Sequence, residues 1–240
     1  MARKRLTDAA AAGMLAESAL IAHGRGEAFD YLLGEKTCEA ARHAICETAT
    51  RLLSAERCVI SVNGNTVALA GAQLIACAAV LNCPVEVNIY YRTPERMEAL
   101  ISALKEQQKE AAELYPELAA EIDGVQILGA HPDGRIPNLD GPRANCHSDG
   151  ILSADTILVP LEDGDRCEAL IAMGKTVCVI DLNPLSRTAR TASVTIVDEL
   201  TRCIPILLEQ LISGSISHNG NWSNQQNLQG AIAVMLRVLD

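Results

Sequence analysis

Apolar strand-like segments alternate with helix-like segments along most of the chain, and this alternation restricts the fold more than any other sequence feature. Short runs rich in β-branched residues predict strands at 58–62, 85–90, 125–128, 155–160, 176–180 and 193–197. Helices are predicted at about 37–54, 71–81, 94–120, 166–173 and 199–212. Because most strands are apolar throughout, we expect a mostly parallel sheet covered on both faces, in a Rossmann-like three-layer α/β/α fold.

Helical segments precede and follow this α/β unit. The Ala-rich stretch 7–22 predicts a helix that ends in a turn at Gly24-Arg25-Gly26, and a short helix follows at 27–33, ended by Gly34. We therefore expect a single domain over 1–212 with a helical N-terminal segment at 1–54. Residues 213–240 are expected to form a polar linker and an amphipathic helix at 228–239, which would pack on the body or across a dimer interface.

Composition excludes several classes of protein. The 240 residues carry a net charge of −10 and include only one Trp, one Phe and four Tyr, so we expect no nucleic-acid partner. No apolar run is long enough to span a bilayer and no signal-peptide pattern is present, so a cytoplasmic protein without a membrane partner is expected. The nine cysteines form no Cys-x-x-Cys pair and most lie in apolar runs, which predicts buried thiols.

Polar clusters follow each of the six predicted strands. These clusters are Asn63-Gly64-Asn65, Tyr91-Arg92-Thr93, His131 to Arg135, Glu162 to Arg166, Asp181 to Arg190, and Asp198-Glu199. In a parallel α/β sheet the carboxyl ends of the strands share one edge, and ligands bind there. The sequence therefore predicts one composite polar site at this edge.

The charges of these clusters indicate the ligands. Arginines occupy predicted loops or first helical turns at positions 25, 92, 135, 166, 187 and 190, where a guanidinium suits phosphate or carboxylate oxygens. Ser186 can cap a helix that begins at Arg187. Acidic residues at 162, 163, 165 and 181 can hold magnesium, a ribose hydroxyl or an ammonium group. The combination suits a nucleoside triphosphate with magnesium and a second anionic substrate.

Simpler interpretations remain open for several motifs. Gly24-Arg25-Gly26 follows a helix and lacks the third glycine of a dinucleotide fingerprint, so it also fits a plain helix-ending turn. The clusters at 162–165 and 63–65 fit solvated turns equally well. The sequence contains no Walker-type phosphate loop and no Gly-x-Ser-x-Gly elbow. Its histidines lack metal-ligand spacing, and no residue is assigned as a metal ligand.

Several longer segments resemble the archaeal 4-phosphopantoate–β-alanine ligases, also called phosphopantothenate synthetases. The segments that carry the resemblance are 22–35 (AHGRGEAFDYLLGE), 61–65 (SVNGN), 91–93 (YRT), 158–166 (LVPLEDGDR), 181–187 (DLNPLSR) and 195–198 (TIVD). They follow the order of the family and extend over roughly residues 3–212. The tail beyond Gly214 and the loop at 138–148 depart from the family pattern.

The resemblance implies an ATP-dependent ligase of coenzyme A biosynthesis that acts as a homodimer with Mg²⁺. Such an enzyme joins 4-phosphopantoate to β-alanine through an acyl adenylate and releases 4′-phosphopantothenate, AMP and diphosphate. By family match, Arg3 and Arg25 resemble ATP-contacting residues. The segments Asp181-Leu182-Asn183, Ser186-Arg187 and Asp198-Glu199 resemble parts of the nucleotide pocket.

Other assignments come from the residues themselves. Asn63, Asn65 and Arg92 are expected near phosphopantoate, and Asp163 or Asp165 near magnesium or the ammonium group of β-alanine. The reaction needs alignment of a carboxylate with a phosphate and neutralisation of the developing charge, and the attacking amine must lose a proton. Arg25, Asp163 and Asp165 are accordingly the candidate catalytic residues, and no protein nucleophile is required.

Two other classes of protein are considered. A non-catalytic nucleotide-binding metabolic sensor would use the same pocket without turnover. An oxidoreductase would bind a dinucleotide at the sheet edge, but the missing glycine fingerprint argues against it.

Overall fold

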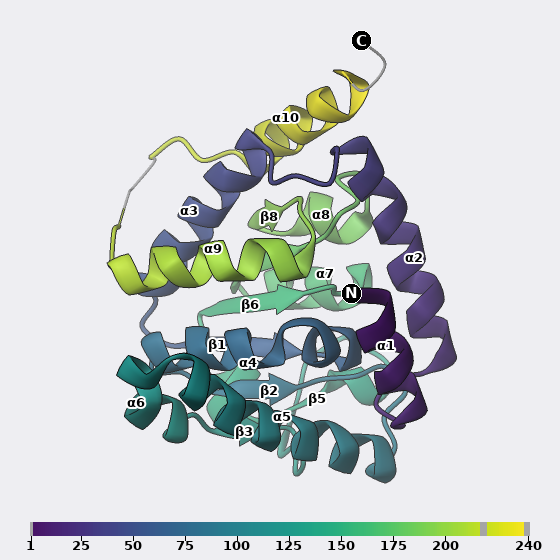
Figure 1. The fold of residues 1–240 in the computed structure, drawn as a ribbon, viewed down its shortest axis with the longest axis vertical. Coiled ribbons are helices and arrows are strands. Elements are labelled where there is room, and N and C mark those ends of the chain that lie inside the picture. The colour runs from purple at the N-terminus through teal and green to yellow at the C-terminus, as the bar shows by residue number, and fades with distance from the viewer. Residues whose placement is uncertain (1, 217–219, 238–240) are drawn as a thin grey trace.

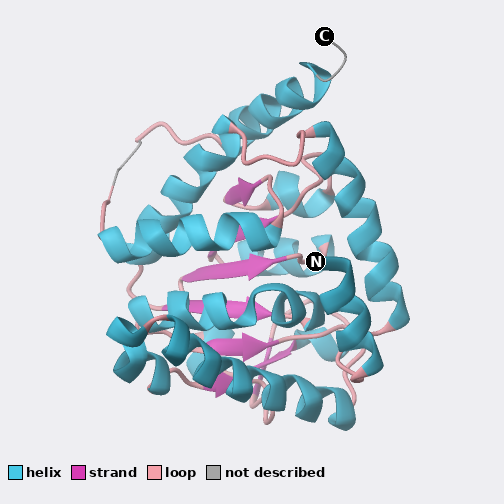
Figure 2. Cartoon of the chain, in the orientation of Figure 1, coloured by secondary structure: helices cyan, strands magenta, loops and turns pink. Residues whose placement is uncertain are grey.

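A six-stranded parallel sheet forms the centre of the molecule. The computed structural model describes residues 2–216 and 220–237. The strands are β1 (Cys58–Val62), β2 (Val85–Val87), β3 (Ile127–Leu128), β6 (Thr156–Pro160), β7 (Thr176–Ile180) and β8 (Val194–Ile196), in the spatial order β3-β2-β1-β6-β7-β8. All of these strands point the same way (Figure 2). This is the doubly wound order, in which the chain changes direction between β1 and β6 and leaves a crevice at their carboxyl ends.

Helices and loops cover both faces of the sheet, which confirms the predicted three-layer fold. Alternate residues of one strand point to opposite faces, as Ile60 and Val59 show. The face of Ile60 packs against α3 (Glu39–Leu53), α4 (Gly64–Val80), α5 (Pro94–Leu114) and α9 (Leu200–Ser213), which lie in front of the sheet in Figure 1. The face of Val59 packs against α7 (Gly164–Ala172) and buried residues of the segment 136–154.

The N-terminal region forms two helices that differ from the predicted ones. α1 (Ala2–Ala11) and α2 (Glu17–Leu32) run across the carboxyl ends of the strands (Figure 1). The break between them contains Gly13 at φ +78°, whereas α2 continues through Gly24 and Gly26. The predicted turn at 24–26 is therefore wrong. Gly26 lies against Leu182, where an added Cβ would be 3.9 Å from the Leu182 Cβ, so this position is set by packing. α2 ends before Gly34, at φ +70°, as predicted.

α4 begins at Gly64, seven residues before the predicted start at Gly71. Asn63 and Thr66 form a capping box that fixes this start. The helix is kinked at Ala70, which has φ −147° and ψ 22°. Two carbonyl oxygens beside the kink accept side-chain hydrogen bonds: Leu69 O from Arg5 and Val67 O from Gln107, each at 2.9 Å. These two side chains therefore hydrogen-bond carbonyl groups beside the kink.

The predicted helix at 94–120 is divided at Pro116. α5 ends at Leu114, and a 3₁₀ turn η1 (Pro116–Leu118) leads into α6 (Ala119–Asp123). Proline lacks the N–H that would continue the helix and restricts the residue before it, so a break at this position follows from the sequence.

The segment 131–150, which includes the polar cluster 131–135 and the part that departs from the family pattern, contains regular structure. It contains β4 (Gly134–Arg135), η2 (Pro142–Ala144), β5 (Asn145–Cys146) and the start of η3 (Ser148–Leu152). The buried carboxylate of Glu86 on β2 anchors it, accepting hydrogen bonds from the backbone N–H of His147 at 2.9 Å and of Ile151 at 2.8 Å. Burial raises the pKa of Glu86. The loop is therefore attached to the sheet by this carboxylate.

The C-terminal segment covers the edge strand β8. α10 (Asn224–Leu236) begins four residues before the predicted helix. Asn224 accepts from the Thr195 N–H at 2.8 Å and donates to Ala192 O at 3.0 Å, while Trp222 Nε1 donates to Ser193 O at 3.0 Å. Leu228 is buried against the body, as predicted for the amphipathic helix. The edge of β8 is thus paired with side chains instead of another strand. Val238 and Leu239, part of the predicted helix, lie outside the described residues.

Six of the nine cysteines are buried free thiols, as predicted, whereas Cys46 is exposed and Cys38 and Cys58 are partly buried. Across residues 2–216 and 220–237, none of the helices combines the length and apolar character needed to cross a bilayer.

Candidate active site

Asn63 joins the carboxyl ends of β1 and β6, where the sheet reverses its strand order. Its side-chain Nδ2 donates to the carbonyl oxygens of Pro160, at 3.3 Å, and of Leu161, at 2.9 Å. Leu161 has φ +56°, a left-handed conformation that few non-glycine residues adopt. The predicted substrate residue Asn63 therefore also has a structural role, because its amide holds the loop after β6 in place.

A cavity of about 240 Å³ opens beside Asn63 and is called here the switch-point cavity. Its walls come from the α1–α2 connection and α2 (Met14, Leu15, Ala16, Ser18, Ala19, Ala22), the start of α4 (Asn63, Gly64, Asn65), the segment after β2 (Asn88, Ile89, Tyr90, Tyr91, Arg96), Arg143, and the loop after β6 (Leu161, Glu162, Asp163). Three predicted site residues, Asn63, Asn65 and Asp163, thus line one cavity. This volume is below the roughly 300–1,000 Å³ of pockets for drug-sized ligands, so it suits a small acid better than a whole nucleotide.

Arg143 is a cavity residue that the sequence did not single out. Its Nη1 lies 2.6 Å from Asp163 Oδ2 and its Nη2 lies 2.8 Å from Asp165 Oδ2. The guanidinium carbon is 4.9 Å from the centre of the Tyr90 ring, within cation–π range. The hydrogen bond from Arg143 lowers the pKa of Asp165, and Arg187 acts in the same direction. The two candidate catalytic acids are therefore brought together by one arginine.

Arg166 lies beneath this cluster and is only 1% exposed. It forms an ion pair with Glu162 and donates to Ser61 Oγ at 3.2 Å, tying α7 to β1. Burial raises the pKa of Glu162, although the charge of Arg166 opposes this effect. The predicted ligand role of Arg166 is not favoured by this placement, because its guanidinium is committed to neighbours within the fold.

The loop after β7 is ordered by its own side chains. Asp181 accepts hydrogen bonds from Ser186 Oγ and, at 2.9 Å, from the Asn183 N–H, and its burial raises its pKa. Ser186 caps the short helix α8 (Arg187–Thr191), accepting from the Ala189 N–H at 2.9 Å, which confirms the predicted cap. Leu182 is buried among residues of α2, α3 and α10.

Two contacts connect the start of α8, directly after the β7 loop, to the acidic segment that follows β6. Thr188 Oγ1 donates to Glu162 O at 2.9 Å, and Arg187 forms an ion pair with Asp165. The predicted nucleotide segment and the acidic loop after β6 therefore lie side by side at the sheet edge.

Asp198 and Glu199, which follow β8, have different environments. Asp198 is 1% exposed and accepts hydrogen bonds from Thr37 Oγ1 at 2.6 Å and from Arg202 Nε at 2.9 Å. Burial alone would lower the pKa of Arg202, but the hydrogen bonds from Arg202 to Asp30 and Asp198 outweigh this effect and raise the pKa. Glu199 caps α9 through Oε2, whereas its Oε1 is buried without a partner in the described part of the chain. Of Asp198 and Glu199, Glu199 therefore has the carboxylate oxygen, Oε1, that is available to accept a hydrogen bond from a ligand.

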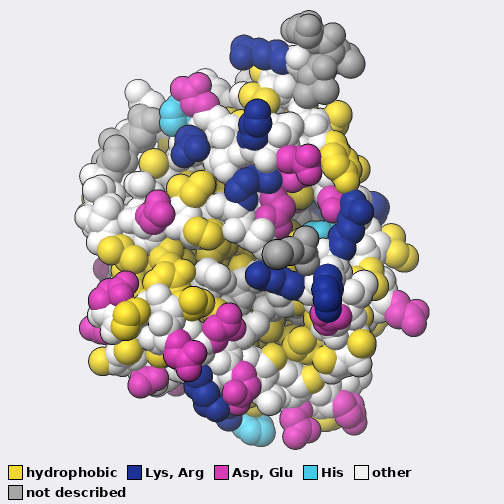
Figure 3. Space-filling model, viewed as in Figure 1, with side chains coloured by type: hydrophobic (Ala, Val, Ile, Leu, Met, Phe, Trp, Pro, Cys, Tyr) yellow, Lys and Arg dark blue, Asp and Glu magenta, His cyan; other side chains and the backbone are white. Residues whose placement is uncertain are grey.

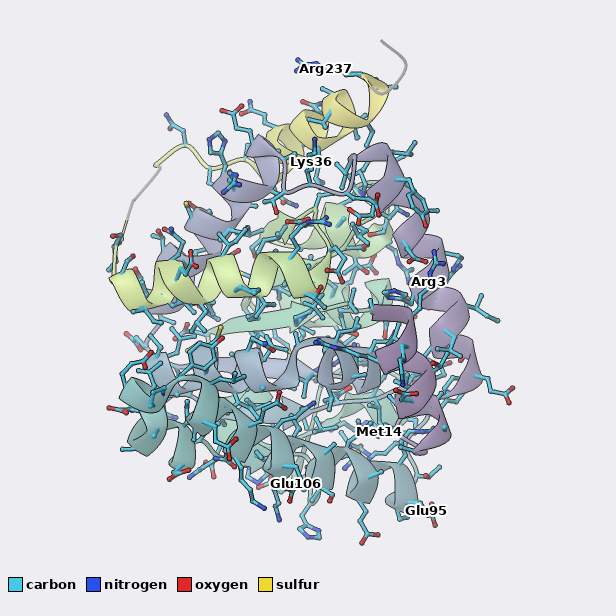
Figure 4. The ribbon with its side chains drawn as sticks, viewed as in Figure 1. Arg3, Met14, Lys36, Glu95, Glu106 and Arg237 are labelled. Atoms are coloured by element: carbon cyan, nitrogen blue, oxygen red, sulfur yellow. The ribbon has the colours of Figure 1, made fainter. Side chains whose placement is uncertain are left out.

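Arg3 and Arg25 lie on the two N-terminal helices. Arg3 on α1 reaches α2 (Figure 4), where its Nε lies 3.0 Å from Glu27 Oε1 and its Nη2 donates to Tyr31 Oη at 2.8 Å. Its hydrogen bond to Glu27 raises its pKa. Arg25 is exposed on α2, beside the glycine that contacts Leu182, and makes no hydrogen bond or ion pair with the residues that the structure describes. Basic side chains gather around the N-terminus in Figure 3.

Arg92 is not brought to the switch-point cavity. Its guanidinium donates to Gly129 O, and the residue lines a separate groove with Met97, Lys105 and His131. Burial lowers its pKa. The arginine of this segment that lines the cavity is Arg96, whose Nη1 donates to Tyr91 O at 2.5 Å. Side chains in a first helical turn point back toward the N-terminus, and this rule could have indicated Arg96 from the sequence.

Asp163 and Asp165 fit the usual mode of magnesium binding. Among the described residues, no group of three or more His, Cys, Asp or Glu side chains is suited to hold a metal. Magnesium is commonly bound by one or two carboxylates together with substrate phosphates, so a cage of protein ligands is not needed.

The doubly wound sheet, a small anion-suited cavity and an adjoining ordered loop define an enzyme that binds small molecules at a strand-order reversal. Residues 40–219 match the family described as phosphopantothenate/pantothenate synthetase. The 4-phosphopantoate–β-alanine ligases of Thermococcus kodakarensis and Thermococcus onnurineus are each 45% identical to the chain over 207 residues, covering 86% of it and 74% of each relative. The ligase of Methanospirillum hungatei is 46% identical over 202 residues, covering 84% and 76%.

The chain belongs to the phosphopantothenate/pantothenate synthetase family. The family resemblance and the expected enzyme class, a ligase, are thereby confirmed.

Proposed function

We propose that the protein is an ATP-dependent ligase that joins 4-phosphopantoate to β-alanine, giving 4′-phosphopantothenate, AMP and diphosphate in coenzyme A biosynthesis. The names of the relatives support the two substrates. The observation that carries the proposal is the contact between the start of α8, which directly follows the ordered loop after β7, and the acidic segment after β6. Thr188 contacts Glu162, which lines the switch-point cavity, and Arg187 contacts the neighbouring Asp165. An acid in the cavity and a nucleotide on the loop would meet at this contact.

The nucleotide site is proposed over residues 181–199, with Arg3 and Arg25 on the helices that cross it. The open Oε1 of Glu199 suits a ribose hydroxyl, because it is a buried acceptor that lacks a donor in the described residues. Arg25 has no hydrogen-bond or ion-pair partner among residues 2–216 and 220–237, so its guanidinium is available for a phosphate, whereas Arg3 would exchange its contacts with Glu27 and Tyr31 for one. Mg²⁺ would neutralise phosphate charge beside Asp163 and Asp165.

The chemistry follows from these positions. The carboxylate of 4-phosphopantoate would attack the α-phosphate, giving an acyl adenylate with a good leaving group. β-Alanine would then attack the acyl carbon as its neutral amine and displace AMP. Asp163, a partly exposed carboxylate in the cavity wall, would accept the proton. Arg25 and Arg187 would stabilise the charge that develops on the phosphate oxygens.

The test uses purified protein with ATP, Mg²⁺, β-alanine and either pantoate or 4-phosphopantoate. We expect AMP release with the phosphorylated acid, dependent on β-alanine. ATP binding without AMP release would instead support the nucleotide-binding sensor, and NAD binding would support the oxidoreductase. A homodimer, which the family resemblance implies, is expected in sedimentation analysis.

A further inference from the structure

The two arginines of the switch-point cavity differ in their charge balance. Arg143 faces two carboxylates, Asp163 and Asp165, at 2.6 and 2.8 Å. Arg96 has no carboxylate partner among the residues that the structure describes, and it is only partly exposed. Arg187 pairs with Asp165 and Glu168, so Arg143 and Arg187 are both neutralised by carboxylates of the fold. Arg96 therefore leaves a positive charge that an anionic ligand would neutralise.

Three polar atoms of the cavity residues are buried without a hydrogen-bond partner in the described part of the chain. They are Arg96 Nε, Arg143 Nε and Asn65 Oδ1. A buried polar group without a partner is costly, and most such groups in folded proteins are satisfied by protein or ordered water. The two Nε–H groups are donors that suit ligand oxygens, whereas Asn65 Oδ1 is an acceptor that suits a ligand hydroxyl, so their presence among the residues of one cavity indicates a polar ligand.

Part of the cavity lining is apolar. Leu15, Ala19 and Ile89 contribute to it. An added Cβ on Gly64 would lie 2.4 Å from Leu15 Cδ2 and 2.8 Å from Met14 O, so the α1–α2 connection presses directly on the start of α4. The cavity thus combines cationic groups with a compact apolar wall, which suits a phosphorylated acid with a branched carbon.

The order of the strands gives the direction of the ligand. Arg96 follows β2, Asp163 follows β6, and the 181–187 loop follows β7, and these strands are arranged β2-β1-β6-β7. A ligand with its phosphate at Arg96 would extend across β1 and present its other end at β6. Its carboxylate would then lie beside the loop proposed to hold the nucleotide.

We propose that Arg96, assisted by Arg143, recognises the phosphate of the acid substrate and makes the enzyme selective for the phosphorylated acid. In this arrangement Leu15 and Ile89 would pack against the quaternary carbon of 4-phosphopantoate. This inference rests on the proposed ligase function. It assigns selectivity to Arg96 instead of Arg92, whose guanidinium contacts Gly129 O outside this cavity.

The test compares Arg96→Gln and Arg96→Lys with Lys105→Gln, a matched loss of charge on an exposed residue of the same helix. A lost hydrogen bond to a charged group predicts that Arg96→Gln raises the KM for 4-phosphopantoate by about 10- to 100-fold. The KM values for ATP and β-alanine should remain near those of the wild type. Arg96→Lys should recover part of the affinity, and the preference for 4-phosphopantoate over pantoate should decrease more in Arg96→Gln than in Arg96→Lys.

Calorimetric titration of 4-phosphopantoate without ATP separates this inference from the proposed function. Weaker binding to Arg96→Gln than to the wild type and Lys105→Gln, with unchanged melting temperatures, would support the role of Arg96. Equal binding and equal KM would overturn it while leaving the ligase activity intact. Wild-type binding of 4-phosphopantoate without any product would contradict the ligase function but not the role of Arg96.

Discussion

The side-chain amide of Asn63 donates a hydrogen bond to the carbonyl oxygen of Leu161, which is 2.9 Å away in space and 98 residues away in the sequence, and so joins the carboxyl ends of β1 and β6. The same side chain caps α4 by accepting from the Thr66 N–H. One residue therefore fixes both the helix and the acidic loop that border the switch-point cavity.

Asn63→Ala should destabilise the protein and reduce its activity. A lost N-cap costs about 1 kcal/mol, and the two hydrogen bonds to the loop after β6 add to this cost. Asn65→Ala is the matched control, because the Asn65 side chain donates one hydrogen bond to α2, from Nδ2 to Ala19 O at 3.3 Å, and joins no strands. Urea unfolding should show the larger loss for Asn63→Ala. Equal losses would contradict the bridging role of Asn63.

Arg25→Ala should impair catalysis without affecting the fold. Arg25 is exposed on α2 and has no partner in the described residues, so its removal leaves no buried group unsatisfied. Loss of one charged donor to a transition state predicts a decrease in kcat/KM for ATP of about 10²- to 10³-fold. Arg42→Ala, an exposed arginine on α3, is the charge-matched control. Unchanged kcat/KM in Arg25→Ala would show that this residue does not contact the nucleotide.

Asn224→Ala should weaken the attachment of α10 to residues 189–195, which lie at the β8 edge of the sheet and within the proposed nucleotide site. The substitution removes hydrogen bonds to Ala189 O, Ala192 O and the Thr195 N–H, and the buried groups left without partners predict a loss of about 1–3 kcal/mol. Hydrogen exchange should increase at 189–195, and the KM for ATP should rise more than that for β-alanine. Gln225→Ala, an exposed change in the same helical turn, should have neither effect. Unaltered exchange in Asn224→Ala would contradict this role.

Asp181 should make stability fall as pH rises through the acidic range. Burial raises the pKa of the folded-state carboxyl above its ordinary value of 3.8, so the folded protein binds this proton more tightly than the unfolded chain does. This contribution is full below the unfolded pKa and is lost as pH passes through the folded pKa. Asp181→Asn should reduce that slope in a plot of unfolding free energy against pH, and the remaining slope is assigned to Glu86 and Glu162, whose pKa values are also raised by burial. A slope equal to that of the wild type would show that another group causes it.

The sequence predicted those parts of the structure that local chemistry determines. β1 and β7 match their predicted bounds because continuous apolar β-branched runs define buried strands, and Ser186 caps α8 as its position indicated. Gly24 and Gly26 were misleading, since their local preference for a turn is overridden by the packing of α2 on Leu182. Arg143 was missed because its place depends on a loop that the distant Glu86 carboxylate anchors.

The acyl adenylate is the central claim of the proposed mechanism, and isotope transfer tests it directly. Attack on the α-phosphate transfers one carboxylate oxygen to AMP, whereas attack on the γ-phosphate transfers it to inorganic phosphate. We therefore expect that 4-phosphopantoate labelled with ¹⁸O in its carboxylate, turned over with ATP and β-alanine, will yield AMP carrying one labelled oxygen, measured by mass spectrometry. Formation of ADP together with labelled inorganic phosphate would contradict the adenylate mechanism.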